Sequence, residues 1–187
     1  SFPTVNADQC ACPAIITGMP LRPEIISGAL PKEDAVKKIN ERWNCKFKPE
    51  NPVLLVFGGS LGATSINRNV KCTSPDIPDL KKLQVIHLSG PGKLSEIQDY
   101  YEDSPCQVLV LESTGDMQFL YSAADMVISR SGGSTVSELA FYGKYSILVP
   151  YPFAADSHQD DNAGWLASAG GASILKDSEC SPEAFVK

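Results

Sequence analysis

Residues 131–138 read Ser-Gly-Gly-Ser-Thr-Val-Ser-Glu, and these residue types suit the binding of an anion. They follow the short apolar run 126–129 and open a helix-like stretch, which predicts a strand, a turn and then a helix. The unpaired N–H groups at a helix start carry partial positive charge, and small side chains leave room for a diphosphate. Glu138 lies about one turn inside this helix, where its carboxylate can accept hydrogen bonds from both hydroxyls of a ribose.

A helix cap is the alternative interpretation of the same segment. Ser134 or Thr135 would then be the N-cap, and Glu138 would close a capping box. Because a cap needs only one or two of these residues, the whole run favours a ligand.

A second glycine-rich turn, Phe-Gly-Gly-Ser-Leu-Gly-Ala at residues 57–63, also follows an apolar run. Its G-G-x-x-G spacing differs from the dinucleotide fingerprint, and the next apolar run ends in Ser89-Gly90 where an NAD-binding chain places an acid. No Gly-Lys-Ser/Thr follows, which excludes a Walker A loop. The turn alone is equally compatible with a tight connection that binds nothing.

A third turn, residues 150–163, puts a polar cluster at the head of a helix, where it could hydrogen-bond a sugar. His158 in this cluster is at least as well explained as a solvated residue. The chain has two histidines, His87 and His158, and shows neither a Ser-His-Asp arrangement nor His-metal spacing. We therefore assign no catalytic residue, no metal and no cofactor to the chain.

Short apolar runs alternate with amphipathic stretches from residue 53 onward, which predicts an α/β fold with a mostly parallel, Rossmann-like sheet covered by helices on both faces. The expected strands are 53–57, 84–88, 107–111, 126–129, 146–149 and 172–175, and the expected helices are 33–43, 63–69, 94–102, 117–124, 135–142 and 158–169. We also expect a short strand at 14–17, a proline-punctuated loop at 20–31, a loop at 71–80 and a helix start at 181–183. Residues 1–13 are interpreted as a leader or linker and 14–187 as one domain.

Composition limits the classes of partner. The 187 residues carry a net charge of −6, which argues against general nucleic-acid binding. No apolar run approaches the roughly 20 residues that span a bilayer. A basic group at Lys37, Lys38, Arg42, Lys46 and Lys48 is either a solvated helix face or a patch for an anionic membrane or partner. The six cysteines are interpreted as reduced thiols.

Taken in order, the three turns resemble the carboxyl-terminal half of the MurG family of bacterial peptidoglycan transferases, which move N-acetylglucosamine from UDP to lipid I. The resemblance runs through 1–3, 17–22, 58–63, 130–138 and 154–163, and the joint order of these pieces makes it specific. The family has a GT-B fold of two Rossmann-like domains with the active site between them. The resemblance implies that this chain is the donor-binding domain and does not contain the amino-terminal acceptor domain.

The resemblance also assigns roles to individual residues. Arg22 matches an arginine near the donor diphosphate, and Ser60 matches a serine that contacts the donor. Thr114 falls where the family presents backbone to uracil, with Met117 nearby, and Gln159 matches a reader of N-acetylglucosamine. The expected donor-binding residues are Arg22, Ser60, Thr114, Gly133, Ser134, Thr135, Val136, Ser137, Glu138 and Gln159, joined by Gly59, Met117, Ser131, Gly132 and His158.

Two departures from the family concern Met19, where Asn is common, and residues 112–116, which replace a more apolar approach to the uracil site. The implied activity is an inverting transfer from UDP-N-acetylglucosamine to a lipid-linked acceptor, performed at the cytoplasmic face of the membrane, or in a plastid if the chain comes from a plant or alga. The family's proposed base is a histidine of the other domain. Open alternatives are a galactolipid-synthase-like transferase, a UDP-sugar epimerase and a non-catalytic subunit of a split transferase.

Overall fold

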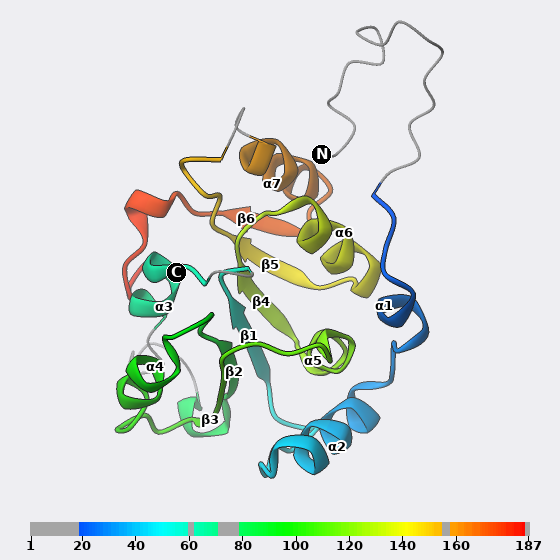
Figure 1. Ribbon diagram of the computed structural model, residues 1–187, viewed down its shortest axis with the longest axis vertical. Coiled ribbons are helices and arrows are strands. Elements are labelled where there is room, and N and C mark those ends of the chain that lie inside the picture. The colour runs from blue at the N-terminus through cyan, green and yellow to red at the C-terminus, as the bar shows by residue number, and fades with distance from the viewer. Residues whose placement is uncertain (1–18, 60–61, 71–78, 155–157, 186–187) are drawn as a thin grey trace, which may run out of the picture.

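The computed structural model describes residues 19–59, 62–70, 79–154 and 158–185. Its centre is a six-stranded sheet in the order β3-β2-β1-β4-β5-β6, in which every neighbouring pair is parallel (Figure 1). The strands are β1 (Val53–Phe57), β2 (Gln84–Leu88), β3 (Gln107–Leu111), β4 (Met126–Ser129), β5 (Tyr145–Leu148) and β6 (Ala172–Ile174). This arrangement confirms the predicted α/β fold with a parallel sheet.

All five residues of β1 are buried because the strand lies in the middle of the sheet with helices on both sides. Its alternate side chains enter two different cores: Val53, Leu55 and Phe57 face one, and Leu54 and Val56 face the other. A continuous apolar run is therefore what this position in the sheet requires.

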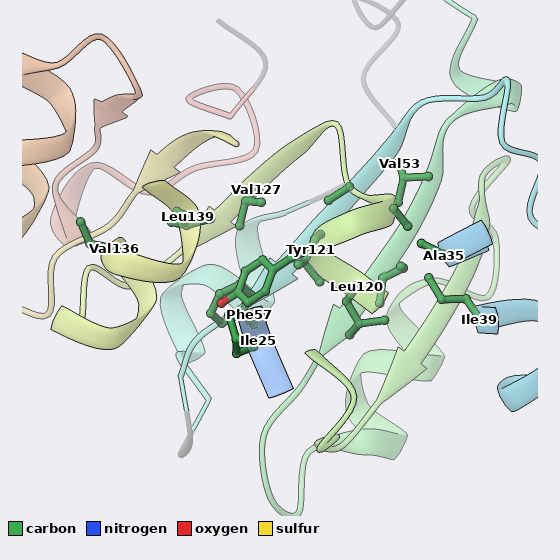
Figure 2. Packing of buried hydrophobic residues seen from close by; sticks show 14 of the residues in the cluster. Ile25, Ala35, Ile39, Val53, Phe57, Leu120, Tyr121, Val127, Val136 and Leu139 are labelled. Carbon is green, nitrogen blue, oxygen red and sulfur yellow. The ribbon is translucent and has the colours of Figure 1, made fainter. Parts of the chain in front are cut away.

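The helices divide between the two faces as these cores indicate (Figure 1). The first core contains buried residues of α1 (Pro23–Ser27), α2 (Lys32–Trp43), α5 (Met117–Ala123), α6 (Gly133–Tyr142) and α7 (His158–Ser168). The second core contains buried residues of α3 (Thr64–Asn69) and α4 (Leu94–Tyr100). Figure 2 shows the first core around Tyr121, whose ring meets that of Phe57 edge to face at a centroid distance of 6.0 Å. The prediction of helices on both faces is confirmed.

The segment 20–31 is not the continuous loop that its prolines predicted, because it contains α1. Pro23 occupies the first turn, where its missing N–H costs nothing, and the N–H of Gly28 closes the turn on the carbonyl of Glu24. Ile25 is fully buried in the first core. Tertiary packing of this one side chain therefore supports a helix that its five residues would not form alone.

The predicted helix start at 181–183 is a hydrogen-bonded turn over residues 182–185 and not a helix. Ser181 behaves as expected of a cap, since its side-chain oxygen accepts the N–H of Ala184 at 3.2 Å. Two short 3₁₀ turns, η2 (Leu80–Lys82) and η4 (Asp177–Glu179), were not predicted. Most other element ends differ from the predicted ones by one or two residues.

Several predictions fall on residues that the structure does not describe. These are the leader 1–13, the strand 14–17, most of the loop 71–80, and Cys10, Cys12 and Cys72. Cys45, Cys106 and Cys180 are free cysteines in the described part of the chain. Within the described ranges, no helix is long and apolar enough to cross a membrane.

Candidate functional site

Two glycine-rich turns meet at the carboxyl ends of β1 and β4, which are neighbours in the sheet. Between them lies an open cleft of about 620 Å³, in the position where open α/β sheets bind ligands. The cleft is lined by Gly58, Gly59, Gly62, Ala63, Thr64, Ser65, Arg130, Gly132, Ser134, Thr135, Tyr151, Gln159 and Asp177. The structure thus brings together five predicted site residues, namely Gly59, Gly132, Ser134, Thr135 and Gln159.

The first turn depends on glycine for a steric reason at Gly62. Its φ is +69°, and a Cβ there would lie 2.3 Å from the carbonyl oxygen of Ser89. The same oxygen accepts a hydrogen bond from the side-chain amide of Asn67 on α3 at 2.8 Å. The glycine turn and the start of α3 are therefore held against the end of β2.

Beneath this turn, His87 is a core histidine. It is fully buried, with Nδ1 3.0 Å from the Tyr101 hydroxyl and Nε2 3.2 Å from Oδ1 of Asn67. Burial lowers its pKa to about 4, so the ring is neutral near pH 7. Because the Asn67 amide nitrogen donates to Ser89, its oxygen accepts from Nε2. The Tyr101 hydroxyl lies within hydrogen-bonding distance of both Nδ1 and the carbonyl oxygen of Val70, at 3.0 and 3.3 Å.

The second turn opens α6 at Gly133, two residues earlier than the predicted start at Thr135. Gly132 is the N-cap, and no side-chain hydrogen bond caps the helix. The capping-box alternative for Ser134, Thr135 and Glu138 is therefore wrong. No side chain caps the N–H groups at this helix start, and Gly132, Ser134 and Thr135 line the cleft.

Glu138 does not cap the helix start and pairs instead with Arg22. The Nη2 of Arg22 donates to Oε1 of Glu138 at 3.2 Å, and the carboxylate side chain is only 7% exposed. Arg22 also lies 3.8 Å from Glu24. A buried carboxylate is costly without a partner, and this arginine, itself half exposed, supplies one.

Tyr121 completes the surroundings of Glu138 from the core side. Burial raises the pKa of its hydroxyl well above the usual value of 10, and the charge of Glu138 beside it raises the pKa further. The hydroxyl therefore stays protonated beside the Glu138 carboxylate. Sequence reasoning missed Tyr121 because an aromatic residue inside an apolar helix is ordinarily core.

Ser131 and Gln159 join the second and third turns. The Ser131 hydroxyl is buried and donates to the carbonyl of Gln159 at 2.7 Å, and the amide of Asn162 donates to the carbonyl of Ser131 at 3.0 Å. Oε1 of Gln159 accepts the backbone N–H of Tyr151 at 3.0 Å, which fixes the side chain at the edge of the cleft. The structure thus gives the Ser131 hydroxyl a bracing contact rather than a place at the cleft.

The side chains of the remaining predicted helix-start residues are engaged within the protein. Val136 is fully buried in the first core, and the Ser137 hydroxyl donates to the carbonyl of Gly133 at 2.9 Å. A Cβ on Gly133 would lie 2.9 Å from the terminal methyl of Met19, so a side chain here would displace that flexible methionine. This turn can therefore offer a ligand its main-chain N–H groups.

Other predicted residues lie outside the cleft. Thr114 is half-buried and its hydroxyl accepts the N–H of Asp116 at 3.0 Å, while Met117 begins α5 and packs on the first core. His158 is exposed at the first turn of α7. Ser60 belongs to the residues that the structure does not describe.

Eight cleft residues were not among the predicted ligands, and they include Ser65, Arg130, Tyr151 and Asp177. Arg130 directly follows β4, and Tyr151 comes three residues after the end of β5. Both lie in the segments 130–138 and 150–163, so their positions were a usable signal. Ser65 and Asp177 had none, because only the folded chain brings η4 beside α3. Within the described residues, no group of three or more His, Cys, Asp or Glu side chains could hold a metal ion.

Comparison with known proteins identifies the family. The sequence pattern described as "Glycosyltransferase family 28 C-terminal domain" matches residues 53–187. The chain belongs to this family. A crystal structure of MurG from Acinetobacter baumannii superimposes on the chain with a TM-score of 0.70 and 30% identity, covering 100% of this chain and 48% of that one. This similarity confirms the resemblance and the GT-B carboxyl-terminal fold.

Relatives with curated names agree with the structural match. Proteins named "UDP-N-acetylglucosamine--N-acetylmuramyl-(pentapeptide) pyrophosphoryl-undecaprenol N-acetylglucosamine transferase" are 37% identical in Thermodesulfovibrio yellowstonii and 35% identical in Solibacter usitatus. The matches cover 92% and 99% of this chain but 45% and 47% of those proteins. The chain thus spans about half the length of these relatives. The glycosyltransferase of kitacinnamycin, at 19% identity and a TM-score of 0.53, shares the fold.

Proposed function

We propose that residues 14–187 form the donor-binding domain of an inverting glycosyltransferase that moves N-acetylglucosamine from UDP-N-acetylglucosamine to lipid I in peptidoglycan synthesis. The observation that carries the proposal is the cleft between the glycine turn after β1 and the uncapped start of α6. A diphosphate placed there would meet main-chain N–H groups and the positive end of a ten-residue helix. The names of the relatives supply the sugar and the acceptor.

The nucleoside would lie beside this cleft, with its ribose toward Glu138. A carboxylate that is 7% exposed and already held by Arg22 is preorganised to accept ribose hydroxyls. Uracil would face the backbone at Thr114, and the sugar would face Gln159. Ser60 and the N–H groups of residues 133–135 would hold the diphosphate, since the N–H of Val136 already donates to the carbonyl of Gly132 at 3.0 Å.

In the proposed reaction, an acceptor hydroxyl attacks the anomeric carbon while the bond from that carbon to the UDP oxygen breaks. Negative charge then grows on the departing diphosphate, where the start of α6 and the Arg22 guanidinium would stabilise it. The proton of the acceptor hydroxyl would pass to a base outside this domain. The role of the chain is therefore to bind and orient the donor.

The acceptor would be presented at the cytoplasmic face of a membrane, with the protein bound peripherally. Support comes from the lipid-linked substrate in the names of the relatives and from the exposed Lys37, Lys38, Lys46 and Lys48. Arg42, the fifth residue of the basic group, is also exposed but lies 3.4 Å from Asp116. Vesicle co-sedimentation with and without anionic lipid tests this placement.

The function is tested by product analysis with the full-length protein, labelled UDP-N-acetylglucosamine and a lipid I analogue. We expect transfer of the labelled sugar to the lipid and release of UDP. Replacing the donor with UDP-galactose should abolish most of the transfer, whereas efficient galactose transfer would indicate a galactolipid-type enzyme. Conversion of the donor sugar without an acceptor would identify an epimerase, and donor binding without transfer until a partner is added would identify a split transferase.

A further inference from the structure

Arg130 lines the cleft, but its side chain is used for contacts within the protein. Its Nη1 donates to the carbonyl oxygens of Val149 and Pro150, each at 3.1 Å, and its Nη2 donates to the hydroxyl of Ser65 at 3.1 Å. Nη1 also lies 2.5 Å from Oδ1 of Asp177. The arginine side chain is only 12% exposed, so these contacts are shielded from water.

The neighbouring carboxylate of Asp177 neutralises the charge of Arg130. Asp177 is 25% exposed, and the same Oδ1 that meets the guanidinium accepts a hydrogen bond from Ser65 at 2.5 Å. The guanidinium carbon also lies 5.4 Å from the ring centroid of Tyr151. An arginine with a carboxylate in direct contact has little net charge to offer a bound anion.

These contacts join three segments that are distant in sequence. Ser65 belongs to α3, behind the glycine turn, Val149 and Pro150 follow β5, and Asp177 opens η4. Arg130 directly follows β4 and stands between them. Both walls of the cleft are therefore connected to the planar guanidinium of Arg130. Lysine could not replace it, because an ammonium group does not present several donors in fixed directions.

We propose that Arg130 is a positioning residue that fixes the width of the cleft, and that Asp177 keeps it in this role. The Arg130–Asp177 pair sets the distance between α3 and the segment after β5. At this distance the glycine turn and the start of α6 can both contact the same diphosphate. The inference rests on the proposed donor site, and it differs from a role for Arg130 as a direct phosphate ligand.

The two roles predict opposite effects of Asp177→Asn. A direct ligand would be released by loss of the carboxylate, and UDP would bind as tightly as before or more tightly. A positioning residue would lose the carboxylate that fixes its side chain, and UDP would bind about tenfold more weakly. Uridine lacks the diphosphate, so its affinity should change less than twofold.

The experiment is calorimetric titration of the full chain with UDP and with uridine. The variants are Asp177→Asn, Arg130→Lys and Ser65→Ala, and the control is Glu179→Gln, which alters an exposed pair with Lys176 in the same 3₁₀ turn. We expect the first two to lose UDP affinity about equally, Ser65→Ala to lose less, and the control to match wild type. Thermal unfolding of each variant checks that it is folded, and Ser65→Ala keeps the test open if the charged variants unfold.

Unchanged or tighter UDP binding by Asp177→Asn would overturn the inference and leave the donor site standing. Equal losses for UDP and uridine would also overturn it, because the tie would then support the fold generally. A wild-type chain that binds neither ligand would instead overturn the proposed function, and this inference with it.

Discussion

The guanidinium of Arg22 lies 3.2 Å from Oε1 of Glu138, although 116 positions separate the two residues in the sequence. The contact bears on both proposed roles, since Glu138 would bind the ribose and Arg22 the diphosphate. Arg22 is the half-exposed partner, and Glu138 is held in the core beside Tyr121. Donor binding would therefore keep the carboxylate in place and turn the arginine toward the phosphates.

Glu138→Gln should remove the discrimination between ribose and deoxyribose. We expect wild type to bind UDP at least about tenfold more tightly than 2′-deoxy-UDP, because a hydrogen bond to a charged group contributes roughly 1.5–3 kcal/mol. The variant should bind the two ligands within about threefold of each other. Calorimetry with both ligands measures this, and the control is Glu24→Gln, an exposed acid that contacts the same arginine. A variant that still prefers UDP tenfold would remove the ribose role.

Arg22→Met should destabilise the folded chain through Glu138. The substitution leaves a buried carboxylate without its cation, which we expect to cost about 1–3 kcal/mol of unfolding free energy, at the low end for a half-exposed arginine. Adding Glu138→Gln should recover about half of the loss, since a neutral amide tolerates burial better. Urea denaturation of the two single variants and the double variant gives the coupling energy. Additive losses would show that the two residues do not interact.

The stability of the chain should fall as the pH decreases from 7 to 5 because of His87. Its pKa of about 4 in the folded chain lies below the ordinary histidine value of 6.5, so between these pH values the unfolded chain binds a proton and the folded chain does not. The contribution is fully present above pH 6.5, decreases toward pH 4, and amounts to about 2 kcal/mol between pH 7 and 5. Denaturation at both pH values should show a smaller difference for His87→Gln, in which the carboxylates still titrate. Equal differences in the two proteins would contradict the assignment.

Two glycine-to-alanine substitutions should have opposite effects on stability. Gly62→Ala places a methyl group 2.3 Å from the Ser89 carbonyl in a backbone with φ of +69°, which should destabilise the chain by about 2 kcal/mol or more. Gly164→Ala adds a methyl group to open space inside α7 and should stabilise it by about 0.5–1 kcal/mol. Melting temperatures measured side by side provide the check, and a neutral Gly62→Ala would show that the turn moves freely.

The strands were predictable because each is a short apolar run, and in a doubly covered sheet both faces of a strand must be apolar. The start of α6 was less predictable, since the sequence offered Ser134 and Thr135 as caps and the helix begins earlier, at Gly133. The helix α1 escaped prediction because it depends on one side chain, Ile25, entering a distant core.

The candidate site was also predictable only in part. The turns that meet at the cleft were visible in sequence because each follows a strand, and topology then places them at one edge. The pairing of Arg130 with Asp177 was not visible in the sequence, because an ion pair between segments far apart in the chain leaves no local sequence pattern. The sequence also could not show that the Ser131 hydroxyl donates to the carbonyl of Gln159. A serine that makes an internal hydrogen bond and a serine that binds a ligand have the same sequence pattern.

The sheet order has a consequence for how the chain is made. The strand β1 is synthesised first, and all five of its residues end up buried between β2 and β4. Its partner β2 emerges early, but the edge that β4 covers stays open until residue 126 has been added. During that interval the nascent chain exposes an unpaired, wholly apolar strand edge, the kind of surface from which aggregation begins. Slow translation before β4 should therefore lower the yield of soluble protein.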